Sequence, residues 1–235
     1  MLNMLNLQRR NNSFLIRSIE VYGAKEYEVY NNSAAVYQEE SGFWLFSIDK
    51  PGDFSKLCGQ ITRPLRTFYI NDPKCFGEVT SVIPGAAARE YIQYVLDSNE
   101  YRKSPAPLNQ EINIVPLDAD WTDFILGLYN NEEFSNRKYI NMCIEKNPGF
   151  GALINGTKTG FVMIHIDGEI GPMAITENAR GKGVGSTLMS YIVPKYIAAA
   201  SIGCGFVLPE NVCSQRMMKK ACFKPLEKNI IWVYH

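Results

Sequence analysis

The feature that most constrains the fold is a strand, a glycine-rich turn and a helix that follow one another between residues 168 and 200. The apolar strand ends at Ile175, and the glycines that open the helix are Gly181, Gly183 and Gly185. Glycine lets backbone N–H groups approach a bulky anion, and a helix N-terminus adds favourable partial charge. Arg180 and Lys182 supply formal positive charge. The stretch therefore predicts an anion-binding cradle.

The spacing of these residues limits which anion fits. The phosphate-loop pattern Gly-x-x-x-x-Gly-Lys-Ser/Thr is absent, and the dinucleotide pattern Gly-x-Gly-x-x-Gly fails because Ser186 and Leu188 stand where its last glycine should be. What remains is Arg180-x-x-Gly183-x-Gly185 after a strand. A glycine-rich turn that only joins a strand to a helix is the structural alternative.

This pattern resembles the coenzyme A pyrophosphate loop of the GNAT acyltransferase superfamily, which has the form Arg/Gln-x-x-Gly-x-Gly/Ala. Downstream, Asn211 and Phe223 match the family pattern and Ser214 is acceptable, whereas Met218 and Cys222 depart from its tyrosine and glycine. The resemblance covers residues 111–235.

A closer resemblance is to the glycine N-acyltransferase branch, whose chains carry a degenerate N-terminal GNAT-like half. In that branch a Gly-Glu pair stands twelve residues before the loop arginine and supplies the general base. Here Gly168 and Glu169 hold that position before Arg180. The segments 21–23 (Val-Tyr-Gly) and 143–149 (Cys-Ile-Glu-Lys-Asn-Pro-Gly) also look like that branch.

The resemblance implies an α+β (mixed α/β) chain with a tandem GNAT-like fold, in which helices flank a mixed central sheet in each half. Two prolines near residues 101–109 favour an extended linker. We therefore expect a degenerate N-terminal domain over 1–107 and an acyl-CoA-binding catalytic domain over 108–235. Residues 42–49 and 160–167 also match at Gly, Phe, Ile and Asp, and each follows an apolar strand as the second strand of a hairpin would. This short match arises either from duplication or by chance.

Hydrophobic periodicity and turn residues predict the elements. Strands are expected over 14–22, 34–39, 43–48, 67–71, 112–117, 150–154, 160–166, 169–175, 204–208 and 228–234. Helices are expected over 53–60, 86–97, from Asp118 or Asp120, from Ser135, from the glycine-rich turn to Ala200, and over 211–221.

By the resemblance, the chain is an N-acyltransferase that moves an acyl group, most simply acetyl, from acyl-CoA to the amine of a small molecule, with amino acids among the candidates. Glu169 is the candidate base, and its alternative is a solvated carboxylate in a turn; His165 is the second candidate. A positioned base is needed because an alkyl ammonium must lose a proton before it attacks. The expected coenzyme-binding residues are Met173, Ala174, Ile175, Arg180, Gly181, Lys182, Gly183, Val184, Gly185, Ser186 and Asn211. Asn211 is also placed to cap the helix after it.

Met218 is the main departure, because relatives place a tyrosine there as general acid and a thioether donates no proton. A non-enzymatic acyl-CoA binder or sensor is therefore an alternative, and an acetyltransferase acting on proteins is a weaker one. A nucleophilic role for Cys213 or Cys222 is not favoured, since the sequence places no histidine beside them.

Composition narrows the partners. The 235 residues carry a formal net charge of zero, which argues against a nucleic-acid footprint, and no run of eighteen apolar residues suggests a membrane span. The six cysteines form no C-x-x-C pair, and the first ten residues lack the pattern of a signal peptide. We therefore expect a cytoplasmic protein with acetyl-CoA or another short acyl-CoA as co-substrate, a small-molecule amine as acceptor, no metal, and no nucleic-acid or membrane partner.

Overall fold

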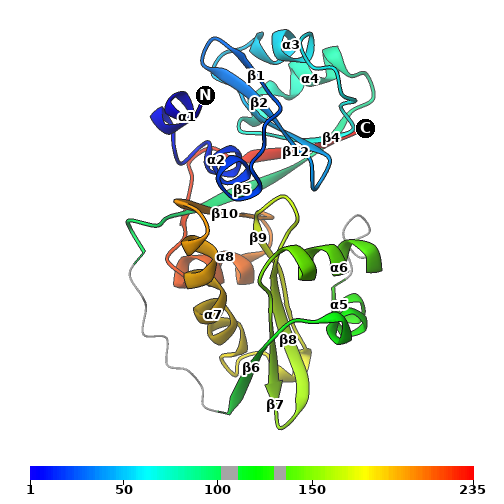
Figure 1. Ribbon diagram of the computed structural model, residues 1–235, viewed down its shortest axis with the longest axis vertical. Coiled ribbons are helices and arrows are strands. Elements are labelled where there is room, and N and C mark those ends of the chain that lie inside the picture. Colours follow the sequence, from blue (N-terminus) through cyan, green and yellow to red (C-terminus); the bar gives the residue numbers. More distant parts are fainter. Residues whose placement is uncertain (102–110, 130–135) are drawn as a thin grey trace.

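The computed structural model describes residues 1–101, 111–129 and 136–235, and its strands form two sheets (Figure 1). The elements before residue 102 are α1 (Leu2–Leu7), α2 (Ser13–Tyr22), β1 (Tyr27–Tyr30), β2 (Ser33–Gln38), β3 (Phe43–Ser47), α3 (Asp53–Cys58), β4 (Thr67–Ile70), the 3-10 helix η1 (Pro73–Cys75), α4 (Phe76–Val82) and β5 (Ala87–Asp97). The elements after residue 110 are β6 (Ile112–Pro116), η2 (Ala119–Trp121), α5 (Thr122–Leu128), α6 (Arg137–Lys146), β7 (Phe150–Ile154), β8 (Thr157–Ile164), β9 (Ile170–Ile175), η3 (Glu177–Ala179), α7 (Val184–Ala198), β10 (Ile202–Val207), α8 (Val212–Lys220), β11 (Lys224–Pro225) and β12 (Ile230–Tyr234).

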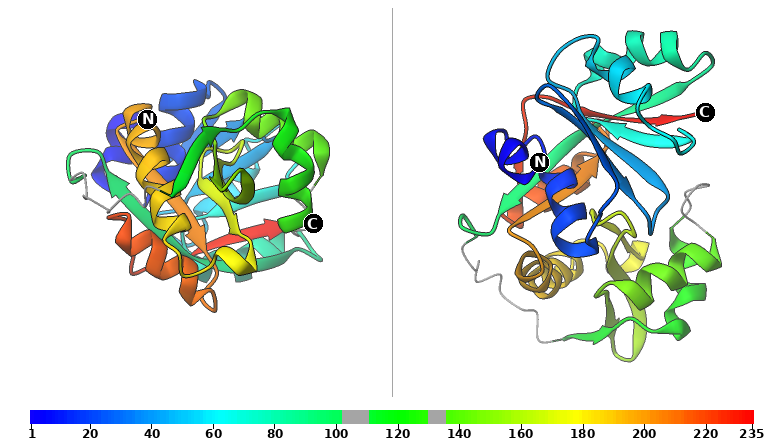
Figure 2. Two further views of the ribbon diagram at one scale, coloured as in Figure 1. Left: turned by 90° about the horizontal axis from the view of Figure 1, so that it is seen from below. Right: turned by 45° about the horizontal axis from the view of Figure 1, so that its top comes forward.

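The larger sheet has the order β1-β2-β3-β4-β12-β5-β10, with β11 paired to β5, and the smaller has the order β6-β7-β8-β9. Among the described strands, β3 and β4 pair in parallel and all other pairs are antiparallel. The last strand, β12, lies between β4 and β5, and Figures 1 and 2 show it in red among strands of the first half. The two halves therefore share one sheet.

The long strand β5 makes this connection. Its first residues pair with β12, from Ala87 to Tyr91, and its last residues pair with β10, from Ile92 to Asp97. The sheet thus continues across the expected boundary between residues 107 and 108. That boundary and most of the expected linker, residues 102–110, lie outside the described residues, and the division into two domains stays a prediction.

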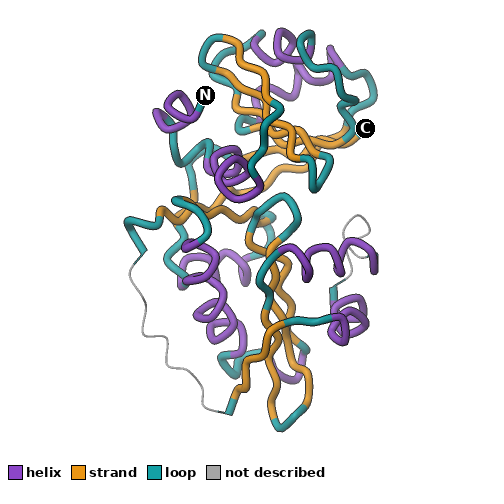
Figure 3. The backbone as a smooth tube through the Cα atoms, viewed as in Figure 1, coloured by secondary structure: helices purple, strands orange, loops and turns teal. Residues whose placement is uncertain are grey.

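Helices cover both faces of each sheet, as the backbone trace shows (Figure 3). They pack against side chains that point alternately to the two faces along each strand. In β8, Phe161 and Met163 pack with the cluster around α5 and α6, whereas Val162 and Ile164 pack under α7. In the larger sheet, residues that include Leu45, Tyr69 and Trp232 face α1 and α2, and residues that include Phe46, Phe68 and Ile231 face α3 and α4. The two halves thus have the same layered arrangement.

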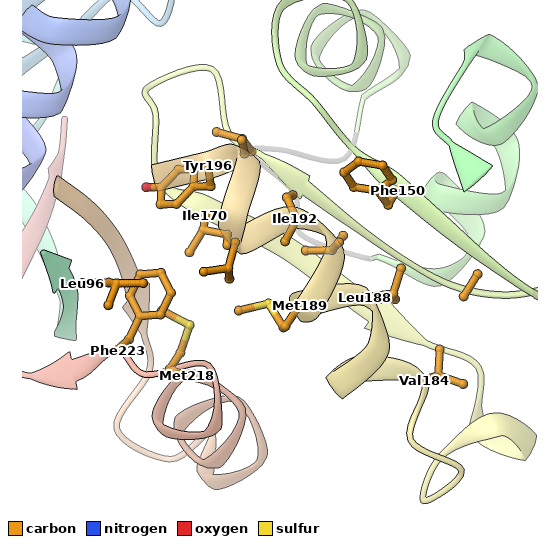
Figure 4. Packing of buried hydrophobic residues seen from close by; sticks show 14 of the residues in the cluster. Leu96, Phe150, Ile170, Val184, Leu188, Met189, Ile192, Tyr196, Met218 and Phe223 are labelled. Atoms are coloured by element: carbon orange, nitrogen blue, oxygen red, sulfur yellow. The ribbon is translucent and has the colours of Figure 1, made fainter. Parts of the chain in front are cut away.

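The core of the second half gathers around α7 (Figure 4). Its buried side chains include Leu188, Ile192 and Tyr196, which pack against Phe150 of β7 and Ile170 of β9. This packing fixes the start of α7 relative to the end of β9, and it therefore fixes the glycine-rich turn between them.

Two sequence predictions are wrong. The strand expected over 14–22 is helix α2, whose residues Ser13–Ser18 are buried. The short apolar run Phe14–Ile16 does not by its periodicity distinguish a buried helix from a strand. The helix expected over 86–97 is β5, because β12 and β10 provide strand partners that override its helix-forming residues.

The other predicted elements are confirmed to within a few residues, although Ser135, the expected start of α6, lies outside the described residues.

The structure shows where the two segments of the short match, 42–49 and 160–167, lie in their sheets. Both segments contain the second strand of a hairpin, as expected. However, β3 is the last strand of β1-β2-β3 and leads to a helix, whereas β8 is the middle strand of β7-β8-β9. The match joins non-equivalent strands, so the common order of elements, and not this match, relates the halves.

Candidate active site

A cavity of about 670 Å³ lies between the two halves. One part of its wall comes from the turn before β9, from β9 itself and from the start and body of α8, including Glu169, Met173, Asn211 and Met218. The other part comes from strands of the larger sheet: Tyr69 on β4, Arg89 and Tyr91 on β5, and Trp232 and Tyr234 on β12. Strands β9 and β10, which both contribute to the wall, are edge strands of different sheets. An edge strand presents backbone N–H and C=O groups that a ligand can pair with.

Glu169 stands in the turn before β9, and its side chain is 13% exposed. The alternative of a solvated turn carboxylate is therefore wrong. Its Oε2 atom is buried and has no hydrogen-bond partner among the described residues. Burial, together with the nearby charge of Asp167, raises the pKa of Glu169 well above its ordinary value. A carboxyl group in this environment binds a proton readily, which suits a general base that operates near neutral pH.

Asp167 is the second carboxyl group beside this turn. Tyr69 Oη donates to its Oδ2 atom at 3.2 Å, and the backbone N–H of Glu169 donates to its Oδ1 atom at 3.4 Å. Burial raises the pKa of Asp167 to about 6 even though these hydrogen bonds favour the charged form. Since like charges in one site oppose each other, the two carboxyl groups titrate as a coupled pair.

His165 contacts the same pair from the end of β8. Its Nε2 atom lies 3.7 Å from Glu169 Oε1, and its Nδ1 atom lies 2.6 Å from Tyr139 Oη. Burial lowers the pKa of His165 to about 3, so the ring is neutral at physiological pH. A group with so low a pKa is a poor proton acceptor for an alkyl ammonium, and the geometry therefore favours Glu169 over His165 as the base.

A buried arginine holds the turn in place. Arg17 on α2 donates to the carbonyl of Gly168 at 2.7 Å and to the carbonyl of Tyr196 at 3.1 Å, and its guanidinium lies 3.5 Å from the centre of the Tyr196 ring. Tyr196 Oη also donates to Gly168 O at 2.8 Å. The first half thus fixes the backbone beside Glu169.

Two segments noted in the sequence meet at this turn. Tyr22, in the segment 21–23, donates to Asn147 Oδ1 at 2.9 Å, and Asn147 belongs to the segment 143–149. Asn147 Nδ2 in turn donates to the carbonyl of His165 at 3.3 Å. The two segments are therefore structural partners beside the turn that carries Glu169.

The glycine-rich turn has the expected form. Gly183 is the N-cap of α7, and it and Gly181 have φ values of 85° and 77°, in the left-handed region that favours glycine. A Cβ atom at either position would meet no atom within 4 Å, so the backbone there is open to a ligand. Arg180 and Lys182 are exposed beside it.

The first turn of α7 follows directly. The first helical hydrogen bond recorded there runs from Thr187 N to Gly183 O, which leaves the N–H groups of Val184, Gly185 and Ser186 at the helix start. Upstream, Met173, Ala174 and Ile175 are half-buried on β9. Of the coenzyme-binding residues expected from the sequence, Met173 and Asn211 line the cavity itself.

Asn211 and Met218 lie on the side of the cavity formed by α8. Asn211 caps the helix, because its side chain accepts a hydrogen bond from Ser214 N at 3.1 Å, and it also lines the cavity. Met218 is 6% exposed and lines the cavity as well. Cys213 is exposed and Cys222 is half-buried, and neither is among the described residues that line the cavity.

Three residues of the cavity or its support come from places where sequence reasoning expected no function: Arg17, Arg89 and Trp232. For Arg17 a signal existed, since it is a single charge within the apolar run 14–19. Arg89 and Trp232 carry no such signal, because their position depends on strands paired over long sequence distances.

Strands β9 and β10 are edge strands of different sheets, and β9 leads through the glycine-rich turn into α7. This arrangement, in a chain with two layered units, is that of a tandem GNAT fold. Residues 116–222 match the model of the acetyltransferase (GNAT) family, and this part of the chain belongs to that family. No curated protein matches the chain in sequence. Members of the family use acyl-CoA, and the open backbone at Gly181 and Gly183 fits an anionic group of such a ligand.

Solved structures share the fold. A Drosophila protein aligns with a TM-score of 0.70 at 11% identity, over 99% of this chain and 93% of its own. A GCN5-related N-acetyltransferase from Kribbella flavida aligns with a TM-score of 0.58 at 10% identity, over 96% of this chain and 95% of its own. A tandem GNAT protein from the clavulanic acid biosynthesis pathway aligns with a TM-score of 0.53 at 10% identity, over 86% of this chain and 77% of its own.

Within the described ranges, no helix has the length and apolarity needed to cross a bilayer. In the same ranges, no group of three or more His, Cys, Asp or Glu side chains is placed to hold a metal ion.

Proposed function

We propose that the protein is an N-acyltransferase that moves an acetyl or similar short acyl group from acyl-CoA to the amine of a small molecule. The observation that carries this proposal is the buried carboxyl group of Glu169 on the wall of the cavity, with one oxygen that lacks a partner among the described residues. Amino acids are among the candidate acceptors.

In the proposed reaction, Glu169 takes a proton from the acceptor ammonium, directly or through water. The neutral amine then attacks the thioester carbonyl carbon, so that a C–N bond forms and the C–S bond breaks. The products are an amide and coenzyme A, and the amine loses its second proton as the thiolate gains one. A positioned base contributes on the order of 10²–10⁴-fold to such a reaction.

The coenzyme is held by backbone groups and by charge. The N–H groups of Val184, Gly185 and Ser186, together with Gly181 and Gly183, cradle the pyrophosphate, since the start of a helix favours an anion. The charges of Arg180 and Lys182 attract the same group. Edge-strand backbone groups of Met173, Ala174 and Ile175 pair with the pantetheine arm, and the Asn211 side chain orients that arm. In this proposal the first half, residues 1–107, does not bind the coenzyme.

Departure of the thiolate requires no tyrosine at the position of Met218. A thiol has an ordinary pKa of about 8.5, so a thiolate is a competent leaving group without a strong acid beside it. The proposal therefore predicts a slower enzyme than one with a general acid, and normal binding of the coenzyme.

Glu169→Gln tests the proposed base. We expect acetyl-CoA-dependent thiol release to fall by roughly 10²–10⁴-fold, whereas the thermal stabilisation by acetyl-CoA stays unchanged. Glu177→Gln is the matched control, since Glu177 is exposed in η3 near the coenzyme loop, and it should leave both readouts unchanged. Loss of less than about fivefold in Glu169→Gln would rule out a role for this carboxylate as the base.

The buried thioether of Met218 favours a second candidate, a protein that binds acyl-CoA without turning it over. This candidate predicts acyl-CoA binding that Arg180→Glu removes, with no thiol release on any amine tested. Thiol release that depends on both an amine and Glu169 would exclude it.

A further inference from the structure

A row of three side chains crosses the larger sheet beneath the cavity. Trp232 on β12 stands opposite Tyr69 on β4 in one direction and opposite Arg89 on β5 in the other. Residues that stand opposite each other point to the same face of a sheet, and all three line the cavity. Neighbouring strands lie about 4.8 Å apart, so the backbones of Tyr69 and Arg89 are roughly 10 Å apart.

The Tyr69 end of the row is the end nearest the proposed base. Tyr69 Oη donates to Asp167, two residues before Glu169. The aromatic wall is also rigid. The rings of Tyr69 and Trp232 pack edge to face with their centroids 4.6 Å apart, and the centroid of the Phe206 ring lies 4.9 Å from that of Tyr69. An acceptor that places its amine at Glu169 can thus extend along Trp232 towards Arg89.

Arg89 is the one cationic side chain among the described residues that line the cavity, given that His165 is neutral. Its recorded ion pair, with Glu210, is 3.4 Å long, and the two side chains are 55% and 68% exposed. Exposed pairs of this kind contribute little free energy, so Arg89 can exchange Glu210 for a ligand at small cost. Arg89 lies on β5 of the larger sheet, whereas the glycine-rich turn precedes α7, and neither Gly181 nor Gly183 lines the cavity. Arg89 is therefore not part of the coenzyme cradle.

We propose that the acceptor is a primary amine that also carries an anionic group, and that Arg89 binds this group at the far end of the Tyr69–Trp232–Arg89 row. The inference rests on the proposed function and adds a substrate class to it. The separation along the row favours an anion several bonds from the amine over the short spacing in glycine. A guanidinium binds carboxylate and phosphonate alike, so both anions fit the subsite.

The test compares acceptors that differ only at the far end. 4-Aminobutyrate carries a carboxylate, 4-aminobutanamide is its neutral counterpart, 3-aminopropylphosphonate carries the alternative anion, and glycine has the short spacing. In the wild type we expect kcat/KM for 4-aminobutyrate to exceed that for the amide by roughly ten- to a hundredfold, the range of a hydrogen bond to a charged group. We also expect it to exceed the value for glycine. The ratio between carboxylate and phosphonate then identifies the preferred anion.

Variants locate the effect. Arg89→Gln should remove the preference for the carboxylate over the amide, and Arg89→Lys should keep part of it. Arg63→Gln is the matched control, because Arg63 is another partly exposed arginine of the first half, paired with Glu26 and absent from the cavity wall. Glu210→Gln should keep the preference or increase it, since Glu210 competes for the same guanidinium.

A binding measurement separates this inference from the proposed function. Calorimetric titration of 4-acetamidobutyrate into protein saturated with coenzyme A reports on the subsite without turnover. Binding that Arg89→Gln weakens by tenfold or more, in a protein that releases no thiol, would support the subsite and overturn the acyltransferase proposal. Equal kcat/KM for acid and amide, or a preference that survives Arg89→Gln, would overturn the subsite and leave the acyltransferase proposal intact. Failure of 4-acetamidobutyrate to bind the wild type would also overturn the subsite.

Discussion

The two halves of the chain have the same order of strands and helix, but they differ in what lies at the start of one corresponding helix. In each half an antiparallel meander ends in a strand, and a helix follows it: α3 follows β3, and α7 follows β9. In the second half, the turn before the helix is glycine-rich, carries Arg180 and Lys182, and opens a helix of 15 residues. In the first half, the helix has 6 residues and begins after Gly52.

The two helix starts differ in whether a side chain accepts hydrogen bonds from the backbone N–H groups there. In the first half the carboxylate of Glu78, on α4, accepts hydrogen bonds from Gly52 N at 2.9 Å and from Ser55 N at 2.8 Å. Burial alone would raise the pKa of Glu78, but these hydrogen bonds hold it below the ordinary value. In the second half, the space beside Gly181 and Gly183 is open.

One half therefore fills its anion position with its own carboxylate, and the other leaves the position accessible. This explains in physical terms why a common fold need not mean a common ligand. The first half contributes in another way, through Arg17 behind the turn of Glu169 and through Tyr69 and Arg89 on the cavity wall.

The largest effect tests the dependence of the second half on the first. Arg17→Leu removes a buried cation and leaves the carbonyls of Gly168 and Tyr196 without its hydrogen bonds. We expect the free energy of unfolding to fall by about 3–5 kcal/mol, as when one member of a buried charged network is removed. Urea denaturation measures this, with the exposed Arg66→Leu as control, expected to change stability by less than about 0.5 kcal/mol. A loss below about 1 kcal/mol would show that the turn does not need the first half.

The second prediction compares the two helix starts with the same charge reversal. Arg180→Glu should abolish the stabilisation by acetyl-CoA, which is about 2.7 kcal/mol at a concentration one hundred times the dissociation constant. Lys50→Glu, before α3 in the first half, should leave the ligand-induced shift in melting temperature unchanged. Thermal unfolding with and without acetyl-CoA measures both. Equal loss in the two variants would mean that the first half also binds the coenzyme.

The second half was the more predictable of the two from sequence. Its motif residues lie close together along the chain, so the strand, the glycine turn and the capping role of Asn211 could all be inferred from local spacing. The same holds for the departure at Met218, which the structure places on the cavity wall.

The first half was less predictable because its structure depends on distant partners. The residues of β5 favour a helix locally, and they form a strand only because β12, from the other end of the chain, lies beside them. Helix α2 looks like a strand for a related reason, since it buries Ser13–Ser18, polar residues included, and this narrows the polar face that reveals a helix. The proposed acceptor end of the cavity combines residues of β4, β5 and β12, and no local pattern could have assembled it.

The third prediction concerns the coupled carboxyl groups beside the cavity. The folded-state pKa of Asp167 is about 6, above its ordinary value of 3.8, so the folded protein loses stability as pH rises through this interval. Asp167→Asn removes this loss, and we expect a gain on the order of 1–2 kcal/mol at pH 7 relative to the wild type, with little gain at pH 4. Unfolding curves at the two pH values measure it.

The same variant affects activity. The negative charge of Asp167 raises the pKa of Glu169, so its removal should move the acidic limb of the kcat/KM profile to lower pH. Tyr69→Phe should move the limb in the same direction by less, because it keeps the carboxyl group of Asp167 and removes only a hydrogen bond that favours its charged form. A limb that moves to higher pH in Asp167→Asn would contradict the coupling.

The smallest effect tests whether Glu78 keeps the first half closed to anions. Glu78→Gln retains the shape of the side chain and removes its charge, so the N–H groups of Gly52 and Ser55 keep a weaker acceptor. We expect a loss of about 1 kcal/mol in the free energy of unfolding, similar to that of a helix cap, because charge at this helix start is favourable. Glu28→Gln, an exposed carboxylate on β1, is the control. If the stability of Glu78→Gln rises with phosphate concentration while that of the wild type does not, the two helix starts differ only in their occupant. If phosphate stabilises neither protein, the first half has also lost the shape of an anion site, since α3 provides less than two turns of helix behind it.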